Sequence, residues 1–414
     1  MRMRIQAAAF FALTCCFAAA EAADPALLKA IAANDIAALD AAAATAADPG
    51  EKSLAEGTAL ALRHRDGEAF VLLMQLAQSG AERDIRKAAY MTAAEITLRQ
   101  GRFAQTAGLM QRAAALGGGK LEDSAQQTLG FVTALSPVPP MRVLHKASGS
   151  LAATRDKAHL LRAKVRIGGS VEDAIIDSGA GFSTVSESAA KRIGLKMLDE
   201  GASVGSSSMK AVTTRLGVAE RLAFGKTVLT DVVFIVLPDA ALSFAEGAYT
   251  IDAIIGLPVF EALGRIEVAR TGGKEVLRYG PRPGKAVGSN LLLSGVQPIV
   301  LAKVDGAAEP MRFFIDTGAN DSMFNASLLQ DYPVFAAAAQ KKTLKLGGAG
   351  GIATDEQAQI LPAVTLHVGS RSVALKDVSV RSEPETGHHG TIGQDVMGKG
   401  WVLDFENMRF SIAG

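Results

Sequence analysis

Hydrophobic residues follow a helical pattern in the first third of the chain. Between positions 24 and 135 the sequence is rich in Ala, Leu, Gln, Glu and Arg. Apolar residues recur there at intervals of three and four, for example at Phe70, Leu73, Met74 and Ala77. Such spacing places apolar side chains on one face of an α-helix. The pattern therefore predicts α-helical hairpins over residues 23–135.

One part of this helical segment resembles a known repeat. Two helical patterns within Ala88 to Leu116 are separated by a break at Gln100-Gly101-Arg102, as in a tetratricopeptide-type helix pair. The Trp, Tyr and Pro positions of that repeat are not all present. Three interpretations stay open: a module that binds a protein partner, a cap that packs on the domain that follows, and an inhibitory prosegment.

Prolines at positions 137, 139 and 140 end the helical pattern, because proline lacks an amide donor and favours extended geometry before it. A linker is predicted over residues 136–157. Beyond it, short runs of Val, Ile, Thr and Gly predict the strands of an all-β region. These runs cover residues 161–167, 174–176, 228–236, 299–304, 313–315 and 373–380.

An internal repeat organises the β-rich region. Ile175-Ile176-Asp177-Ser178-Gly179-Ala180 recurs 139 residues later as Phe314-Ile315-Asp316-Thr317-Gly318-Ala319. A second pair of landmarks, Ile254-Ile255-Gly256 and Thr391-Ile392-Gly393, lies 137 residues apart. A glycine-rich stretch stands between the landmarks of each copy, and a hairpin-like tail closes each copy. The repeat predicts two similar lobes at residues 158–280 and 298–414, joined by a linker at 281–297.

The repeated turns carry carboxylates with catalytic potential. If the two turns meet at a pseudo-two-fold axis, Asp177 and Asp316 face each other. Two carboxylates at about 3 Å cannot both ionise, so they share one proton. One can then act as a general base on water while the protonated one polarises a carbonyl group. Ser178 and Thr317 supply hydroxyls that can brace the turns, and the glycines permit close approach.

At these residues the chain resembles the aspartic proteases, and specifically the bacterial retropepsin-like group with two β-barrel lobes in one chain. The resemblance covers roughly residues 158–412. It implies an acid protease fold with Asp177 and Asp316 as the catalytic pair, supported by turn residues Ser178, Gly179, Ala180, Thr317, Gly318 and Ala319.

The same resemblance assigns other parts of each lobe. It places Ile255, Gly256, Ile392 and Gly393 in loops beneath the active-site turns. It makes the glycine-rich stretches flaps over the substrate, with Gly205, Ser206, Gly347 and Gly348 as candidate contacts. Pepsin-like lobes usually have Ser or Thr where this chain has Ala180 and Ala319. Because a hydroxyl there stabilises the ionised carboxylate, its absence predicts a mildly acidic to neutral pH optimum.

Composition narrows the class of partner. The chain has 43 Lys and Arg residues against 42 Asp and Glu residues, without the basic excess that a nucleic-acid binder needs to neutralise phosphates. A peptide or protein substrate is therefore expected, and no nucleic acid. His388 and His389 are adjacent and are expected in an exposed loop, so neither a metal nor another cofactor is predicted. Trp401, the single tryptophan, is expected to anchor the last strands.

The first 22 residues predict export. Arg2 and Arg4 precede an apolar stretch from Ile5 to Ala20, and Ala20-Glu21-Ala22 fits a cleavage site of a signal peptide. The stretch is shorter than the roughly 20 residues of a membrane span, which disfavours the alternative of an anchor. Both cysteines, Cys15 and Cys16, lie in this segment. The mature chain would therefore use neither disulfides nor thiolate chemistry, and a periplasmic location is expected.

Together these observations predict an exported aspartic endopeptidase with helical hairpins followed by two all-β lobes. The alternative is a non-catalytic exported scaffold that binds peptides or proteins through degenerate protease lobes. In both cases no membrane span is expected after removal of the signal.

Overall fold

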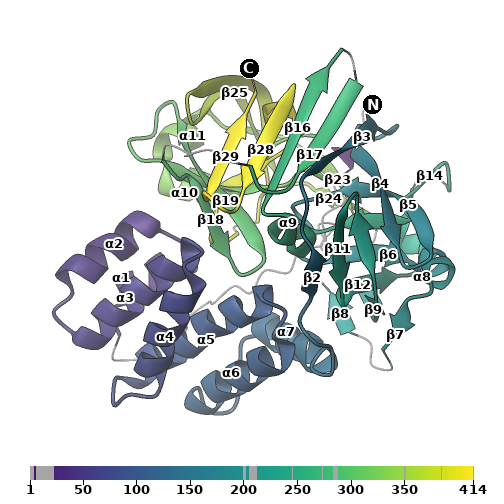
Figure 1. Cartoon of the computed structure of the whole chain (residues 1–414). Coiled ribbons are helices and arrows are strands. Elements are labelled where there is room, and N and C mark those ends of the chain that lie inside the picture. The colour runs from purple at the N-terminus through teal and green to yellow at the C-terminus, as the bar shows by residue number, and fades with distance from the viewer. Residues whose placement is uncertain are drawn as a thin grey trace. The chain divides into compact units, whose positions relative to one another are not determined.

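The computed structural model describes residues 4–5, 23–198, 202–204, 212–244, 246–272, 274–282, 288–348, 351–383 and 385–413. The chain divides into two compact units (Figure 1). One unit holds the described residues of Met141–Leu291 and Gln297–Gly414 together with a short strand near the N-terminus. The other holds residues 23–140 and Leu292–Val296.

Helices make up the second unit, as the apolar spacing predicts. Aspartates start the first three of them. Asp24, Asp35 and Asp48 each accept a hydrogen bond from a backbone N–H of the first turn, at 2.8, 3.1 and 2.8 Å. The helices in its described residues are α1 (Pro25–Ala32), α2 (Ile36–Thr45), α3 (Pro49–Leu62), α4 (Asp66–Ala77), α5 (Arg83–Arg99), α6 (Phe103–Leu116) and α7 (Asp123–Ala134).

The first lobe of the β-rich unit is built mainly from antiparallel strands. Its strands are β2 (Arg142–His145), β3 (Gly149–Arg155), β4 (Leu161–Ile167), β5 (Ser170–Ile176), β6 (Ser183–Ser186), β7 (Lys196–Met197), β8 (Ala202–Val204), β9 (Val212–Ala219), β10 (Leu222–Phe224), β11 (Thr227–Thr230), β12 (Val232–Leu237), β13 (Ser243–Phe244), β14 (Tyr249–Thr250), β15 (Ala253–Ile255), β16 (Arg265–Thr271) and β17 (Lys274–Tyr279). Its helices are α8 (Glu187–Ile193), the 3-10 turn η1 (Asp239–Leu242) and α9 (Leu257–Leu263).

The second lobe repeats this plan with fewer strands. They are β18 (Leu291–Ser294), β19 (Gln297–Val304), β20 (Met311–Ile315), β21 (Met323–Phe324), β22 (Gln340–Lys341), β23 (Leu344–Gly348), β24 (Gly351–Asp355), β25 (Gln359–Val368), β26 (Arg371–Val380), β27 (Gly390–Ile392), β28 (Gly400–Asp404) and β29 (Arg409–Ile412). Its helices are α10 (Ala326–Asp331), α11 (Pro333–Ala338) and α12 (Gln394–Met397).

Strand pairing shows that the two lobes share one topology. In the first lobe the order is β4-β5-β15-β6-β12-β9, and in the second it is β19-β20-β27-β21-β26-β25. Equivalent pairs also run in the same sense. β5 is parallel to β15 as β20 is to β27, and β6 is parallel to β12 as β21 is to β26. The predicted pseudo-symmetric pair of β lobes is therefore confirmed.

The predicted tails of the two copies join the lobes. β16 pairs with β17 and β28 pairs with β29 as antiparallel hairpins. β16 also pairs with β28, with Val268 opposite Trp401, so one continuous sheet runs through both lobes. Trp401 is 1% exposed, which agrees with its expected role as an anchor of these strands.

The predicted linkers differ from the structure. Residues 136–157 contain β2 and β3, and β3 is a sheet strand between β17 and β4. Residues 281–297 contain β18 and the start of β19. Sequence pattern missed β3 because its partner β17 is more than 100 residues away, so no local hairpin signal marks it.

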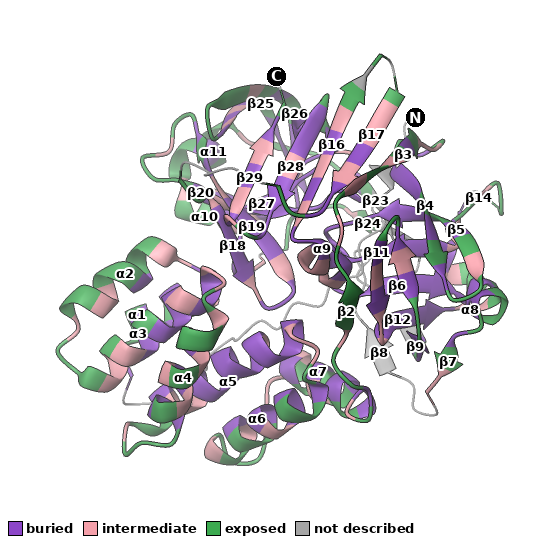
Figure 2. Ribbon diagram, viewed as in Figure 1, coloured by how far each residue is buried: buried purple, intermediate pink, exposed green. Residues whose placement is uncertain are grey.

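Burial follows the alternation expected of packed sheets (Figure 2). The strands that lead to the two aspartate turns are the most deeply buried, with Ile175, Ile176, Phe314 and Ile315 all at 0% exposure. Of the predicted signal segment, the structure describes Arg4–Ile5 (β1), which pairs in parallel with β23. Among the described helices, none combines the length and apolar character needed to cross a membrane.

Candidate active site

The two Asp-Ser/Thr-Gly-Ala turns are held in place by equivalent backbone hydrogen bonds. The amide of Asp177 donates to the carbonyl oxygen of Ile255, and that of Asp316 donates to Ile392, each at 3.0 Å. One step further along, the carbonyl oxygens of Ala180 and Ala319 each accept a backbone N–H at 2.8 Å from the residue after the Ile-Gly glycine. The two Ile-Gly segments therefore support the two turns, as the resemblance implies.

Hydroxyl groups link one turn to the other. Ser178 Oγ donates to the carbonyl oxygen of Ile315 at 2.7 Å, and Thr317 Oγ1 donates to that of Ile176 at 2.8 Å. Each hydroxyl also accepts the backbone N–H of the other residue, at 3.2 and 2.9 Å. All four bonds cross between lobes and are buried. They fix the spacing of the two turns independently of any ligand.

The two carboxyl groups face each other across this brace. Each lies against the glycine of the opposite turn. A Cβ on Gly318 would be 2.5 Å from Cγ of Asp177, and a Cβ on Gly179 would be 2.6 Å from Cγ of Asp316. No larger residue fits at either position. Oδ1 of each aspartate accepts the amide of the glycine two residues on, at 2.8 Å.

The outer oxygens of the pair have no protein donor. Asp177 and Asp316 are both 0% exposed, and Oδ2 of each is buried without a hydrogen-bond partner among the described residues. Two ionised carboxylates are both acceptors, so neither can satisfy the other. A proton held between them supplies the missing donor.

Burial and mutual charge shift both ionisations upward. Burial raises the pKa of Asp177 to about 6, although hydrogen bonds with Asp316 and the turn amides favour its charged form. The pKa of Asp316 is raised well above its usual range, first by burial and then by the negative charge of Asp177. The geometry thus favours a proton on Asp316 beside an ionised Asp177 near neutral pH.

Two hairpins correspond to the predicted flaps. In the second lobe, β23 and β24 pair antiparallel, with Gly347 opposite Ile352 and Gly348 opposite Gly351. In the first lobe, β8 and β9 pair with Val204 opposite Val212. The candidate contacts Gly205 and Ser206 lie outside the described residues.

Sequence reasoning missed two serines that complete the site. Ser183 Oγ accepts the amide of Gly256 at 3.1 Å, and Ser322 Oγ accepts that of Gly393 at 2.9 Å. Each serine stands six residues after its aspartate and obeys the 139-residue offset, so the repeat itself carried the signal. In the second lobe Ser322 also donates through Oγ to Asp395 at 2.6 Å.

The expectation that His388 and His389 are exposed is wrong. They are 5% and 2% exposed. His388 stacks on Phe314 with ring centroids 5.7 Å apart, directly behind the strand that leads to Asp316. His389 Nδ1 accepts the backbone N–H of Arg312 at 3.2 Å, which places its proton on Nε2, 3.4 Å from Asp331. Among the described residues, no three His, Cys, Asp or Glu side chains are placed to hold a metal ion.

Comparisons with known proteins agree with this site. The family model described as "Aspartyl protease" matches residues 163–259, which include the first aspartate turn and the first Ile-Gly motif. Among solved structures, the chain is similar to a retropepsin-like aspartic protease from Rickettsia conorii, at 12% identity and a TM-score of 0.22. That match covers 34% of this chain and 93% of the other. No curated protein matches the chain.

Removing the hydroxyl of Thr317 tests the brace. Thr317→Val keeps the volume but leaves the amide of Ser178 and the carbonyl oxygen of Ile176 without their buried partner. We expect it to lower the free energy of unfolding by roughly 2–4 kcal/mol, and Thr317→Ser to cost much less. The measurement is urea denaturation followed by the fluorescence of Trp401, which lies in β28. Equal stability of the Val and Ser variants would contradict the assigned role of the hydroxyl.

Stability should also depend on His389. Burial, followed by the positive charge of Arg312, lowers the pKa of His389 to about 4. The unfolded chain therefore binds the proton more readily, and stability is lost as pH falls from about 6.5 toward 4. His389→Asn retains an acceptor for the Arg312 amide and does not titrate. We expect the variant to lose less free energy of unfolding than the wild type between pH 7.5 and 5, and an equal loss would refute this.

Proposed function

We propose that this protein is an aspartic endopeptidase that hydrolyses peptide bonds with a water activated between Asp177 and Asp316. The observation that carries the proposal is the buried pair of facing carboxyls, each with an outer oxygen that lacks a protein donor. A structural aspartate in a turn caps backbone amides with both oxygens or faces solvent. Here one oxygen of each caps the turn, and the other is left available to a reacting group.

The proposed reaction assigns one role to each carboxyl. Ionised Asp177 takes a proton from the water as its oxygen attacks the peptide carbonyl carbon. Protonated Asp316 donates its proton to the carbonyl oxygen, which gives a neutral tetrahedral diol. Collapse of the diol breaks the C–N bond while a carboxyl returns a proton to the leaving nitrogen. The pair ends with one proton, as it began, and no covalent enzyme intermediate forms.

An extended peptide is the substrate that fits this arrangement. The β23–β24 hairpin offers backbone groups of an edge strand, and an extended chain can add to such an edge through main-chain hydrogen bonds. The positively charged start and short apolar stretch of residues 1–22 support a further proposal, that the protein is exported to the periplasm and acts there on peptides or proteins. The helical unit is proposed as a site for a protein partner.

Single substitutions of the two aspartates test the activity. Asp177→Asn and Asp316→Asn each remove a proton acceptor or donor at the reacting atoms, so we expect at least a hundredfold loss of kcat on a peptide library digest. Asp377→Asn is the matched control, because it removes an exposed carboxylate at a φ of 53°, which asparagine tolerates. Both active-site variants should stay folded, since each removes a buried carboxyl. Full cleavage by either one would exclude the mechanism and favour a peptide-binding scaffold.

The pH dependence of cleavage follows from the two pKa shifts. The active form needs Asp177 ionised and Asp316 protonated. Because the pKa of Asp177 is about 6 and that of Asp316 is raised well above its usual range, kcat/KM should rise toward pH 6 and fall again when Asp316 ionises. The measurement is kcat/KM for one peptide across pH 3 to 9. An optimum below about pH 3 would be incompatible with a carboxyl pair buried in this way.

A further inference from the structure

A side-chain hydrogen bond connects the second aspartate turn to the first lobe outside the hydroxyl brace. Asn320 follows Ala319 directly, and its Nδ2 donates to the carbonyl oxygen of Ala158 at 2.5 Å. Ala158 lies in the loop between β3 and β4 and is 9% exposed. The connection has no counterpart in the other direction, because Gly181 stands where the 139-residue offset would place the equivalent side chain.

The loop that presents Ala158 is held rigid by one carboxylate. Asp156 Oδ1 accepts the amides of Ala158 and Leu160 at 2.8 and 3.0 Å. The same loop is closed by a backbone bond from the amide of Asp156 to the carbonyl oxygen of Leu160 at 3.1 Å. His159 between them has a φ of 63°, in the left-handed region. A loop closed by these bonds offers the Ala158 carbonyl at a defined position.

Arg162 and Tyr249 hold that carboxylate from behind. Asp156 Oδ2 accepts Arg162 Nε at 2.6 Å and the hydroxyl of Tyr249 at 2.7 Å. The Arg162 guanidinium also donates to the Tyr249 hydroxyl at 3.2 Å and lies over its ring, 5.7 Å from the centroid. The side chains of Arg162 and Asp156 are only 10% and 11% exposed, so this ion pair is largely removed from solvent screening.

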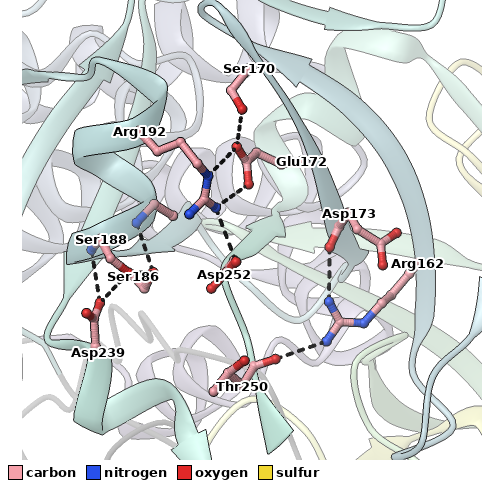
Figure 3. Close-up of polar contacts among 11 residues, drawn as sticks. Arg162, Ser170, Glu172, Asp173, Ser186, Ser188, Arg192, Asp239, Thr250 and Asp252 are labelled. Carbon is pink, nitrogen blue, oxygen red and sulfur yellow. Dashed lines mark hydrogen bonds and ion pairs between the residues drawn. The ribbon is translucent and has the colours of Figure 1, made fainter.

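The cluster is tied to strands that carry the first aspartate. Arg162 stands opposite Ile175 in the β4–β5 ladder, two residues before Asp177. Figure 3 shows its guanidinium reaching the carbonyl oxygens of Asp173, at 3.0 Å, and Thr250, at 3.5 Å. Thr250 leads into β15, which pairs with β5. The same guanidinium therefore contacts both strands beneath the first turn and the loop that meets the second turn.

We propose that Asn320 is a positioning residue, which with the cluster of Asp156, Arg162 and Tyr249 sets the place of the second aspartate turn relative to the first. The inference rests on the proposed function, because the geometry it protects is that of the carboxyl pair. Loss of the Asn320 donor leaves the Ala158 carbonyl and the turn unconnected on this side. The Asp316 carboxyl then shifts relative to Asp177, and catalysis falls while substrate binding remains.

The experiment compares Asn320→Ala, Tyr249→Phe and the double variant in the full-length protein. Gln330→Ala, which removes an exposed amide from α10, is the matched control. We expect Asn320→Ala to lower kcat roughly ten- to hundredfold with KM changed less than about twofold. The double variant should lose no more than the worse single variant, because both act through Ala158. An unchanged kcat, an effect on KM alone, or additive losses would overturn the proposal.

A readout that needs no catalysis separates this inference from the proposed function. Amide hydrogen exchange of the peptide spanning residues 313–322, measured by mass spectrometry, should speed up in Asn320→Ala and Tyr249→Phe and stay unchanged in Gln330→Ala. Exchange at wild-type rates in both test variants refutes the positioning role, whatever the activity. Absence of cleavage by the wild type, together with faster exchange in the variants, refutes the endopeptidase and leaves the positioning role standing.

Discussion

The β-rich unit depends on keeping two carboxyl groups side by side and away from water. Burial of even one carboxylate opposes folding by several kcal/mol unless hydrogen bonds or a pKa shift compensate. Here the glycine amides satisfy Oδ1 of Asp177 and of Asp316, and the raised pKa values leave a proton to be shared by the outer oxygens. Because that arrangement tolerates little error, the surrounding bonds between the lobes are short, buried and reciprocal.

Duplication explains how such precision arises from one local design. A buried strand, a turn, and an Ile-Gly segment under the turn occur twice with the same backbone hydrogen bonds to within 0.1 Å. The two hydroxyl donors then cross between copies in the same way. A single copy could not fold this way alone, since each hydroxyl satisfies groups of the other lobe. The pair of lobes is therefore the smallest unit that forms the site.

The two copies nevertheless place different groups around their aspartates. Behind the second turn lie Asp395, bonded to Ser322, and His388, stacked on Phe314. The first lobe instead contributes the ion pair of Asp156 and Arg162. Chemistry that needs one ionised and one protonated carboxyl requires two different environments, which perfect symmetry would not provide. The asymmetry between the lobes is thus as much a part of the site as the repeat.

The sequence alone determined which parts of the chain repeat and which residues face each other. The helical spacing of residues 23–135, the paired Asp-Ser/Thr-Gly-Ala turns and the Ile-Gly motifs are local patterns, and a local pattern written twice predicts a pseudo-two-fold pair. Ser183 and Ser322 obeyed the same offset, but a lone serine is too common to notice without the bond it makes.

Only the tertiary structure decided the rest, because those contacts join residues that no local pattern relates. The bond from Asn320 to Ala158 spans 162 positions, and that from Tyr249 to Asp156 spans 93. β3 looked like part of a linker because its ladder with β17 is equally distant in sequence. His388 and His389 looked exposed because adjacent polar residues usually are, yet Phe314 and the Arg312 backbone enclose them. Periodicity identifies a buried face, whereas the partner that satisfies a buried polar group is chosen by the fold.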